Sequence, residues 1–336
     1  MSSAPNAHEI ANDATWLAQA LDPVAGMVRL IAMDRESYRL ASFLDDRMLQ
    51  QPVDAKIVPW PDVEAAVGGD LRTDARWIFH IGHVGSTLVS RLLGELDNVL
   101  AVREPRLLRD VALSPPEVRE RYLTAVPKLV SRTFLESEIA CVKATSFVSE
   151  IAPALVPSNE RALFMYAAPR NYIANILAGE NSVIELRHLA ASRAQRLATR
   201  VSALGPARSD AELAALAWAC EMTALEAAAD AMTNRKIAWA DFDAMLRDIA
   251  GELVGVAGFF DFNADEAQLR AVATGSLASR YAKGPEHEYS ASLRAELIAE
   301  ATAANRAAIE GALAMLRSAA EKSAILASAL ERAGED

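Results

Sequence analysis

The feature that most constrains this chain is a short apolar run that enters a glycine turn and then an amphipathic helix. Arg76–Gly82 (RWIFHIG) has the composition of a buried strand, and Gly82 and Gly85 bracket a tight turn. Apolar residues then recur at helical spacing, at Leu88, Leu92, Leu93 and Leu96. Asn98–Val102 is a second short apolar run. This order of strand, turn, helix and strand predicts a βαβ unit and a parallel sheet.

Similar alternation continues along the rest of the chain. The further strand candidates are Val28–Met33, Glu138–Val142, Ala162–Ala167 and Lys236–Phe242. Helical stretches are predicted at Pro116–Thr133, Phe147–Val156 and Asn171–Gly179. We therefore expect an α/β fold of three layers with a central, mostly parallel sheet. A leader, residues 1–70, would pack on one domain, residues 71–336, with a helical insertion at 183–233 and two helical segments within 290–333.

The charge balance and the cysteine content exclude several classes of protein. Lys and Arg number 34 against 45 Asp and Glu, a formal charge of −11, whereas nucleic-acid binding depends on neutralising phosphates. Two cysteines cannot form a disulfide framework, and the N-terminus has neither a basic region nor an apolar core of a signal peptide. No apolar run approaches the length of a membrane span. We expect a cytoplasmic protein that binds neither nucleic acid nor membrane.

The glycine turn has the chemistry of an anion site. Glycines let the backbone curl so that several N–H groups point inward, and the start of a helix adds positive dipole. Ser86 and Thr87 stand at that start, with hydroxyls that can donate to phosphate oxygens. No Gly-Lys-[Ser/Thr] is present, so the lysine and Mg²⁺ pairing of P-loop kinases is missing. The plain alternative is a helix start capped by Ser and Thr.

Gly82-His83-Val84-Gly85-Ser86-Thr87 resembles the 5′-phosphosulfate-binding loop of sulfotransferases, whose family form is Pro-[Lys/Arg]-Ser-Gly-Thr-Thr. These enzymes transfer a sulfuryl group from 3′-phosphoadenosine 5′-phosphosulfate (PAPS) to a hydroxyl or an amine without a metal. Asn98–Glu104 resembles the strand that ends in a catalytic glutamate in the branch that contains protein-tyrosine sulfotransferases. Glu104 follows His83 by 21 residues, which is the spacing of that branch.

Two later segments extend the resemblance over roughly residues 76–180. Cys141–Lys143 is similar to the strand that delivers a lysine to the sulfuryl group, and Leu163–Ile176 to the strand and helix that bind the 3′-phosphate. This 3′-phosphate motif carries an arginine where Ala167 stands and a serine where Asn175 stands. A late Arg-Lys-Gly loop of the family is similar to Arg280–Gly284.

The resemblance implies a role for each matched residue. Glu104 would be the general base and Lys143 would stabilise charge on the bridging oxygen. The 5′-phosphosulfate would bind to Gly82, His83, Val84, Gly85, Ser86 and Thr87. The 3′-phosphate would bind to Arg170, Arg280, Lys283 and Gly284. PAPS would be the donor, no metal is expected, and the acceptor would be a small molecule with a hydroxyl.

Each role has a structural alternative. Glu104 lies between Arg103 and Arg106, which predicts an ion-pair cluster at a strand end. Lys143 could simply face solvent, and Arg170 could pair with an acidic residue. His80 precedes the turn on an apolar strand and is expected to be a hydrogen-bonded core histidine.

Two other functions stay open from the sequence. One is a homologue that binds a nucleotide or anion without catalysis and acts through protein interactions. The Ala-rich C-terminal helices would then be a candidate interface for a homodimer or a partner. The other is a small-molecule P-loop kinase, against which the missing lysine argues. No motif names the acceptor or the pathway.

Overall fold

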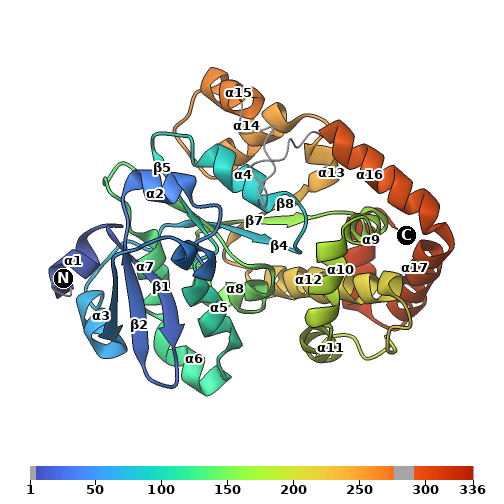
Figure 1. Cartoon of the computed structure of the whole chain (residues 1–336), viewed down its shortest axis with the longest axis horizontal. Helices are drawn as coiled ribbons and strands as arrows, with labels where there is room; N and C mark the ends of the chain where they lie inside the picture. Colours follow the sequence, from blue (N-terminus) through green and yellow to red (C-terminus); the bar gives the residue numbers. More distant parts are fainter. Residues whose placement is uncertain (1–4, 276–290, 336) are drawn as a thin grey trace.

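A five-stranded parallel sheet forms the centre of the computed structural model, which describes residues 5–275 and 291–335 (Figure 1). Its strands are β4 (Arg76–His80), β5 (Val99–Arg103), β6 (Ile139–Lys143), β7 (Arg161–Tyr166) and β8 (Lys236–Asp241). They lie in the order β5-β6-β4-β7-β8, and every neighbouring pair is parallel. The strands predicted from Arg76 onward are all present, so the predicted α/β fold class is confirmed.

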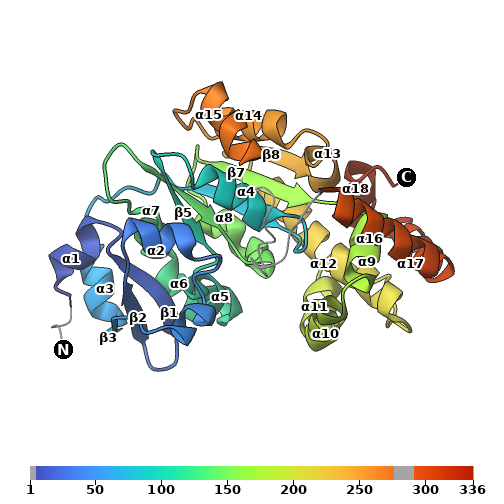
Figure 2. The same ribbon diagram turned by 45° about the horizontal axis from the view of Figure 1, so that its top comes forward.

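Helices cover both faces of this sheet, which explains why β4 and β5 are buried along their whole length. On one side lie α4 (Ser86–Leu93), α14 (Ile249–Phe259) and α15 (Glu266–Thr274). On the other side lie η2 (Ser146–Ile151), α8 (Ala152–Leu155) and the long α12 (Asp210–Ala231). Figure 2 shows the sheet between these two helical layers, as the three-layer prediction required.

The topology opens a crevice at the carboxyl end of β4. This strand lies between β6 and β7, and α4 follows it on one face. The connections that follow β6 and β7 cross the opposite face, through η2 and through α12. Ligands of open α/β sheets bind where connections diverge in this way.

Helical segments after β7 lie beside the parallel sheet (Figure 1). They are α9 (Pro169–Leu177), α10 (Glu180–His188), α11 (Ala190–Ala198) and α12, followed by α13 (Phe242–Met245) after β8. At the C-terminus lie α16 (Ala291–Ala304), α17 (Arg306–Ala320) and α18 (Ala324–Arg332). Two segments were predicted there, but the helix is interrupted twice, at Asn305 and near Ser323. Both residue types compete with the helix by bonding to nearby backbone groups.

The region between β5 and β6 also has one more break than predicted. It contains α5 (Arg106–Leu113), α6 (Pro116–Leu123) and α7 (Val126–Ser131). A single helix was predicted over Pro116–Thr133, but Pro127 lies in the first turn of α7, where a proline is tolerated, and could not sit inside a continuous helix.

The first 66 residues contain a second sheet that the sequence indicated only in part. Its strands are β1 (Trp16–Asp22), β2 (Met27–Ala32) and β3 (Ala55–Pro59), paired antiparallel in that order. The predicted strand Val28–Met33 corresponds to β2. Helices α1 (Ala7–Asn12), α2 (Arg35–Leu40), η1 (Asp46–Gln50) and α3 (Trp60–Ala66) accompany these strands.

A buried arginine, Arg103, connects this N-terminal segment to the parallel sheet. The guanidinium of Arg103, at the end of β5, donates to the carbonyls of Tyr38, Arg39 and Ala41. Burial of this group lowers the pKa of Arg103 to about 10. Just after this contact, the amide of Leu44 donates to the carbonyl of Arg103 at 2.7 Å. Residues 41–47 are therefore held against the carboxyl edge of the sheet, beside the crevice.

Candidate active site

The glycine turn has the strained, left-handed backbone that a tight curl requires. Gly82, His83 and Gly85 have φ angles of 84°, 56° and 62°, and α4 begins immediately afterwards at Ser86. A side chain at Gly85 would overlap the ring of Phe242, so that position has neither the backbone angle nor the space for another residue. A non-glycine residue in the left-handed region, such as His83, is a form of strain found often at functional sites.

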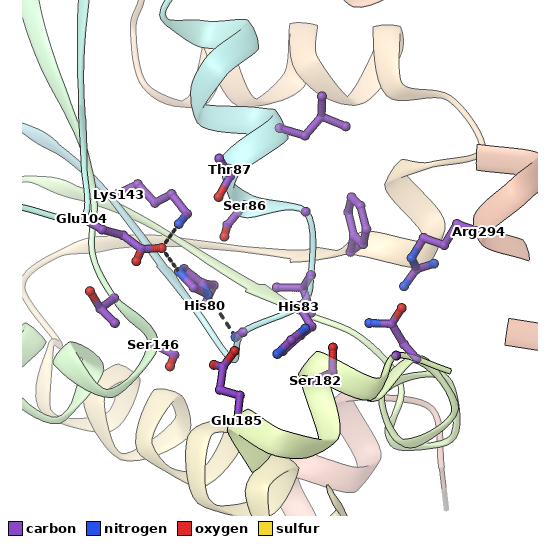
Figure 3. A pocket seen from close by; sticks show the side chains of 18 of the residues that line it. His80, His83, Ser86, Thr87, Glu104, Lys143, Ser146, Ser182, Glu185 and Arg294 are labelled. Carbon is purple, nitrogen blue, oxygen red and sulfur yellow. Dashed lines mark hydrogen bonds and ion pairs between the residues drawn. The ribbon is translucent and has the colours of Figure 1, made fainter. Parts of the chain in front are cut away.

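A cavity of about 530 Å³ opens in front of this turn, at the carboxyl edge of the sheet (Figure 3). The predicted residues that line it are Gly82, His83, Val84, Gly85, Ser86, Thr87, Glu104 and Lys143. They come from the ends of three neighbouring strands and from the start of α4. The structure therefore brings the predicted loop, base and lysine into one site.

Glu104 and Lys143 form an ion pair inside this cavity. Glu104 directly follows β5 and has a left-handed φ of 51°, while Lys143 is the last residue of β6. The side chain of Lys143 is 1% exposed and that of Glu104 is 12% exposed. Burial opposes the charged carboxylate, but the Lys143 ammonium overcomes it, so the pKa of Glu104 lies well below its usual range.

The structure does not support the alternative cluster of Glu104 with its neighbouring arginines. Arg103 points toward backbone carbonyls of the N-terminal segment. Arg106 pairs with Asp46 and Asp110 instead. Lys143 does not face bulk solvent, because its side chain is almost fully buried beside Glu104.

His80, the last residue of β4, is a buried histidine that accepts the Gly82 amide hydrogen bond at Nδ1, 3.0 Å away. That part of the expectation is confirmed. The same side chain also lines the cavity, where its Nε2 lies 3.8 Å from Oε1 of Glu104. Figure 3 shows His80 between the turn and the Glu104–Lys143 pair. Burial, with the Lys143 charge, lowers the pKa of His80 and keeps the imidazole neutral.

Arg170, the predicted 3′-phosphate residue that the structure describes, does not reach this cavity. Arg170 is not among its lining residues, and its guanidinium pairs with Glu310 at 2.6 Å and with Glu335 at 3.6 Å. The structure thus matches the alternative of an acid-paired arginine. Arg280, Lys283 and Gly284 lie outside the described residues.

The two positions where the sequence departs from the family motif have different surroundings. Asn175, on α9, lines the cavity. Ala167 is buried, and its carbonyl accepts a hydrogen bond from Trp218 Nε1 at 2.9 Å. Ala167 therefore belongs to the core and does not line the cavity.

Several cavity residues escaped the sequence analysis. Arg294 of α16 pairs with Asp243 at 2.6 Å and stacks 4.9 Å from the centre of the Phe242 ring. Figure 3 places it on the far side of the glycine turn from Lys143. Phe43 and Arg47 enter from the N-terminal segment, and their guanidinium–ring separation is 3.4 Å. No local motif marks these residues, because remote elements deliver them.

Two searches over the described residues bear on cofactors and on location. No group of three or more His, Cys, Asp or Glu side chains within residues 5–275 and 291–335 is arranged to hold a metal ion. Over the same ranges, none of the helices combines the length and the apolar character that crossing a membrane requires.

Comparisons with known proteins find similarity only among solved structures. No family model and no curated protein matches this sequence. The sulfotransferase domain from the curacin biosynthetic pathway is 10% identical with a TM-score of 0.41, over 62% of this chain and 80% of that one. The sulfotransferase domain from the Synechococcus PCC 7002 olefin synthase is 14% identical with a TM-score of 0.36, over 60% of this chain and 78% of that one. Because both TM-scores are below 0.5, the function has to be argued from this chain's own residues.

Proposed function

We propose that this protein is a sulfotransferase-like enzyme that moves a sulfuryl group from PAPS to the hydroxyl of a small molecule. The observation that carries the proposal is the buried Glu104–Lys143 pair, which opens into the same cavity as the glycine turn. A carboxylate, an ammonium and an anion-binding loop are the three groups that this reaction needs, and no metal is required among them.

The glycine turn and the start of α4 would hold the 5′-phosphosulfate. Their backbone N–H groups and helix dipole favour an anion, and the hydroxyls of Ser86 and Thr87 add donors. Figure 3 shows both hydroxyl side chains on the side of the turn that faces Lys143. The sulfuryl group would then lie between the turn and the strand-end pair.

Lys143 would exchange partners when the donor binds. In the structure its ammonium neutralises Glu104. An anionic phosphosulfate in the cavity would compete for this ammonium, which would then stabilise negative charge on the oxygen that links phosphorus to sulfur. The bond between that oxygen and sulfur breaks, and adenosine 3′,5′-bisphosphate leaves.

Glu104 would become a better base as a result. Without the full Lys143 charge, burial dominates its environment and raises the pKa of the carboxyl toward the range useful for catalysis. The acceptor hydroxyl loses its proton to Glu104 while its oxygen forms the new bond to sulfur. The pair would thus hold the base ionised but weak until a donor is present.

Arg294 is the residue we assign to the 3′-phosphate in place of Arg170. It lies across the cavity from Lys143, as a 3′-phosphate must lie apart from the sulfuryl group, and its planar guanidinium suits a phosphate. The buried Phe242 ring packs beside this guanidinium and close to Gly85.

The second candidate is a nucleotide- or anion-binding protein without transfer activity. The observation that favours it is the ion pairing of Arg170 with Glu310, which removes a family phosphate ligand from the cavity. The two functions separate in one assay, in which the protein is mixed with PAPS and with phenolic and aliphatic alcohols. Catalytic release of adenosine 3′,5′-bisphosphate supports the transferase. Binding of that nucleotide without release in any mixture contradicts it and supports the binding protein.

A further inference from the structure

His80 is buried, but unlike an ordinary core histidine it also lines the cavity. It ends β4, the central strand of the sheet, and its side chain is 7% exposed. It lines the cavity between two parts of the proposed active site, the glycine turn on one side and Glu104 on the other.

The two nitrogens of this imidazole have different surroundings. Nδ1 accepts the Gly82 N–H at 3.0 Å, so it carries no proton, and the proton of the neutral ring must be on Nε2. Nε2 is buried and makes no hydrogen bond within 3.5 Å to any described residue, so its contacts with Glu104 and with the Ala144 backbone are long and weak. Its nearest ion-pair neighbour is Oε1 of Glu104 at 3.8 Å, a separation too long for a hydrogen bond.

A buried N–H group without a partner is costly, and such groups in folded proteins call for a functional reason. Here the reason is close by. When Lys143 turns toward a bound anion, Oε1 of Glu104 loses its present partner, and the Nε2–H of His80 is the donor already directed at that oxygen. A small movement of the carboxylate closes the gap.

We infer that His80 is a positioning residue, which ties the glycine turn to the Glu104 carboxylate through the two nitrogens of one imidazole. This assignment rests on the proposed function. The Gly82 contact fixes the turn that holds the donor, and the Nε2–H contact aims the carboxylate at the acceptor once Lys143 has moved. No proton passes through His80, which stays neutral throughout.

Two substitutions separate the two contacts. In His80→Asn the amide oxygen lies close to the position of Nδ1, so the Gly82 bond is kept and the contact toward Glu104 is lost. In His80→Gln the amide reaches the position of Nε2, so the Glu104 contact is kept and the acceptor for Gly82 is lost. His188→Asn, at an exposed position of α10, is the matched control.

The inference predicts opposite kinetic effects for the two variants. His80→Asn lowers kcat by about 100-fold, the scale of a misplaced reacting group, with little change in the KM for PAPS. His80→Gln weakens binding of PAPS and of adenosine 3′,5′-bisphosphate by about 10-fold and lowers kcat far less. Equal losses in both parameters for both variants would identify His80 as an ordinary core residue and overturn the inference.

A spectroscopic measurement on the unaltered fold avoids dependence on these variants. Nitrogen NMR of ¹⁵N-histidine-labelled protein at pH 7 should show His80 with a bare Nδ1 and a protonated Nε2, and Glu104→Gln should shift the Nε2 resonance. A protonated Nδ1, or a resonance that ignores Glu104→Gln, overturns the inference. Transfer without the kinetic split overturns the inference alone, whereas the expected tautomer with no transfer overturns the proposed function and the role of His80 with it.

Discussion

Glu104 and Lys143 leave neighbouring parallel strands at the same level and are joined twice. The amide of Glu104 donates to the carbonyl of Lys143 at 2.7 Å, and their side chains form a buried ion pair. The backbone bond fixes where the carboxylate begins, and the left-handed φ of Glu104 turns its side chain into the cavity. This carboxylate is therefore positioned by the sheet itself rather than by a loop.

Removing the carboxylate should abolish most turnover while leaving the donor site intact. Glu104→Gln is expected to slow release of adenosine 3′,5′-bisphosphate by 10²–10⁴-fold, the range typical of a lost general base. Binding of that nucleotide, measured by calorimetry, should not weaken, because Lys143 is freed for the anion. Glu95→Gln, which alters a partly exposed carboxylate outside the cavity, is the control. Full activity in Glu104→Gln would show that another group is the base.

Removing the ammonium should destabilise the protein most at neutral pH. Lys143→Met leaves Glu104 buried without its partner, a change that costs about 3–5 kcal/mol in comparable pairs. In the wild type the pKa of Glu104 is lowered, so the pair stabilises the fold above the carboxyl's usual value of 4.5 and this contribution is lost as the pH falls through the lowered pKa.

In Lys143→Met the sign reverses, because burial then raises the pKa of Glu104 above its unfolded value. The stability difference between the two proteins should therefore shrink as the pH falls from 7 toward 4.5. Urea denaturation at several pH values measures it. Lys236→Met, at an exposed position, should cost less than about 0.5 kcal/mol at every pH. A deficit in Lys143→Met that does not change with pH would contradict the coupling of the two groups.

The turn should tolerate no side chain at its second glycine. Gly85→Ala combines a left-handed φ of 62° with overlap on the Phe242 ring, and the backbone angle alone costs about 1–2 kcal/mol. We expect a lower melting temperature and loss of nucleotide binding. Gly255→Ala, within α14 and with open space around it, should instead stabilise the protein by about 0.5–1 kcal/mol. Normal nucleotide binding by Gly85→Ala would remove the turn from the site.

Arg294 should decide whether the site recognises the 3′-phosphate. Arg294→Ala is expected to weaken the binding of adenosine 3′,5′-bisphosphate by about 10–100-fold, which corresponds to the loss of one hydrogen bond to a charged group. The affinity for AMP should stay nearly unchanged. Arg306→Ala, at an exposed position outside the cavity, is the control. Equal weakening of both nucleotides would indicate that Arg294 supports the cavity without contacting the 3′-phosphate.

The sequence predicted those parts of the site that depend on local order. Gly82–Thr87, Glu104 and Lys143 each lie at the end of a strand with a clear apolar pattern, and parallel strands bring such ends to one edge. This rule alone predicts that these residues lie close together, and no contact between distant parts of the chain has to be known. The position of His80 between Gly82 and Glu104 was missed, because its distance to Glu104 depends on the order in which β5, β6 and β4 lie side by side in the sheet.

Residues whose partners lie far along the chain were beyond the reach of sequence patterns. Arg170 follows a buried strand as a phosphate ligand would, but its partner Glu310 lies 140 residues away on α17. Arg294 and Phe43 reach the cavity from opposite ends of the chain. The antiparallel sheet of the first 60 residues was also only partly foreseen, because β1 is buried along nearly its whole length, β3 is mostly exposed, and neither shows regular alternation.

The most direct test of the central claim is a melting-temperature panel with adenosine 3′,5′-bisphosphate, AMP, ADP and Mg²⁺–ATP at millimolar concentration. A ligand at about 100 times its Kd adds about 2.7 kcal/mol, which raises the melting temperature of a chain of this size by several degrees. The account predicts such a rise with the 3′,5′-bisphosphate in wild type, and its loss in Gly85→Ala. A rise with Mg²⁺–ATP alone, or with none of the four ligands, would contradict it.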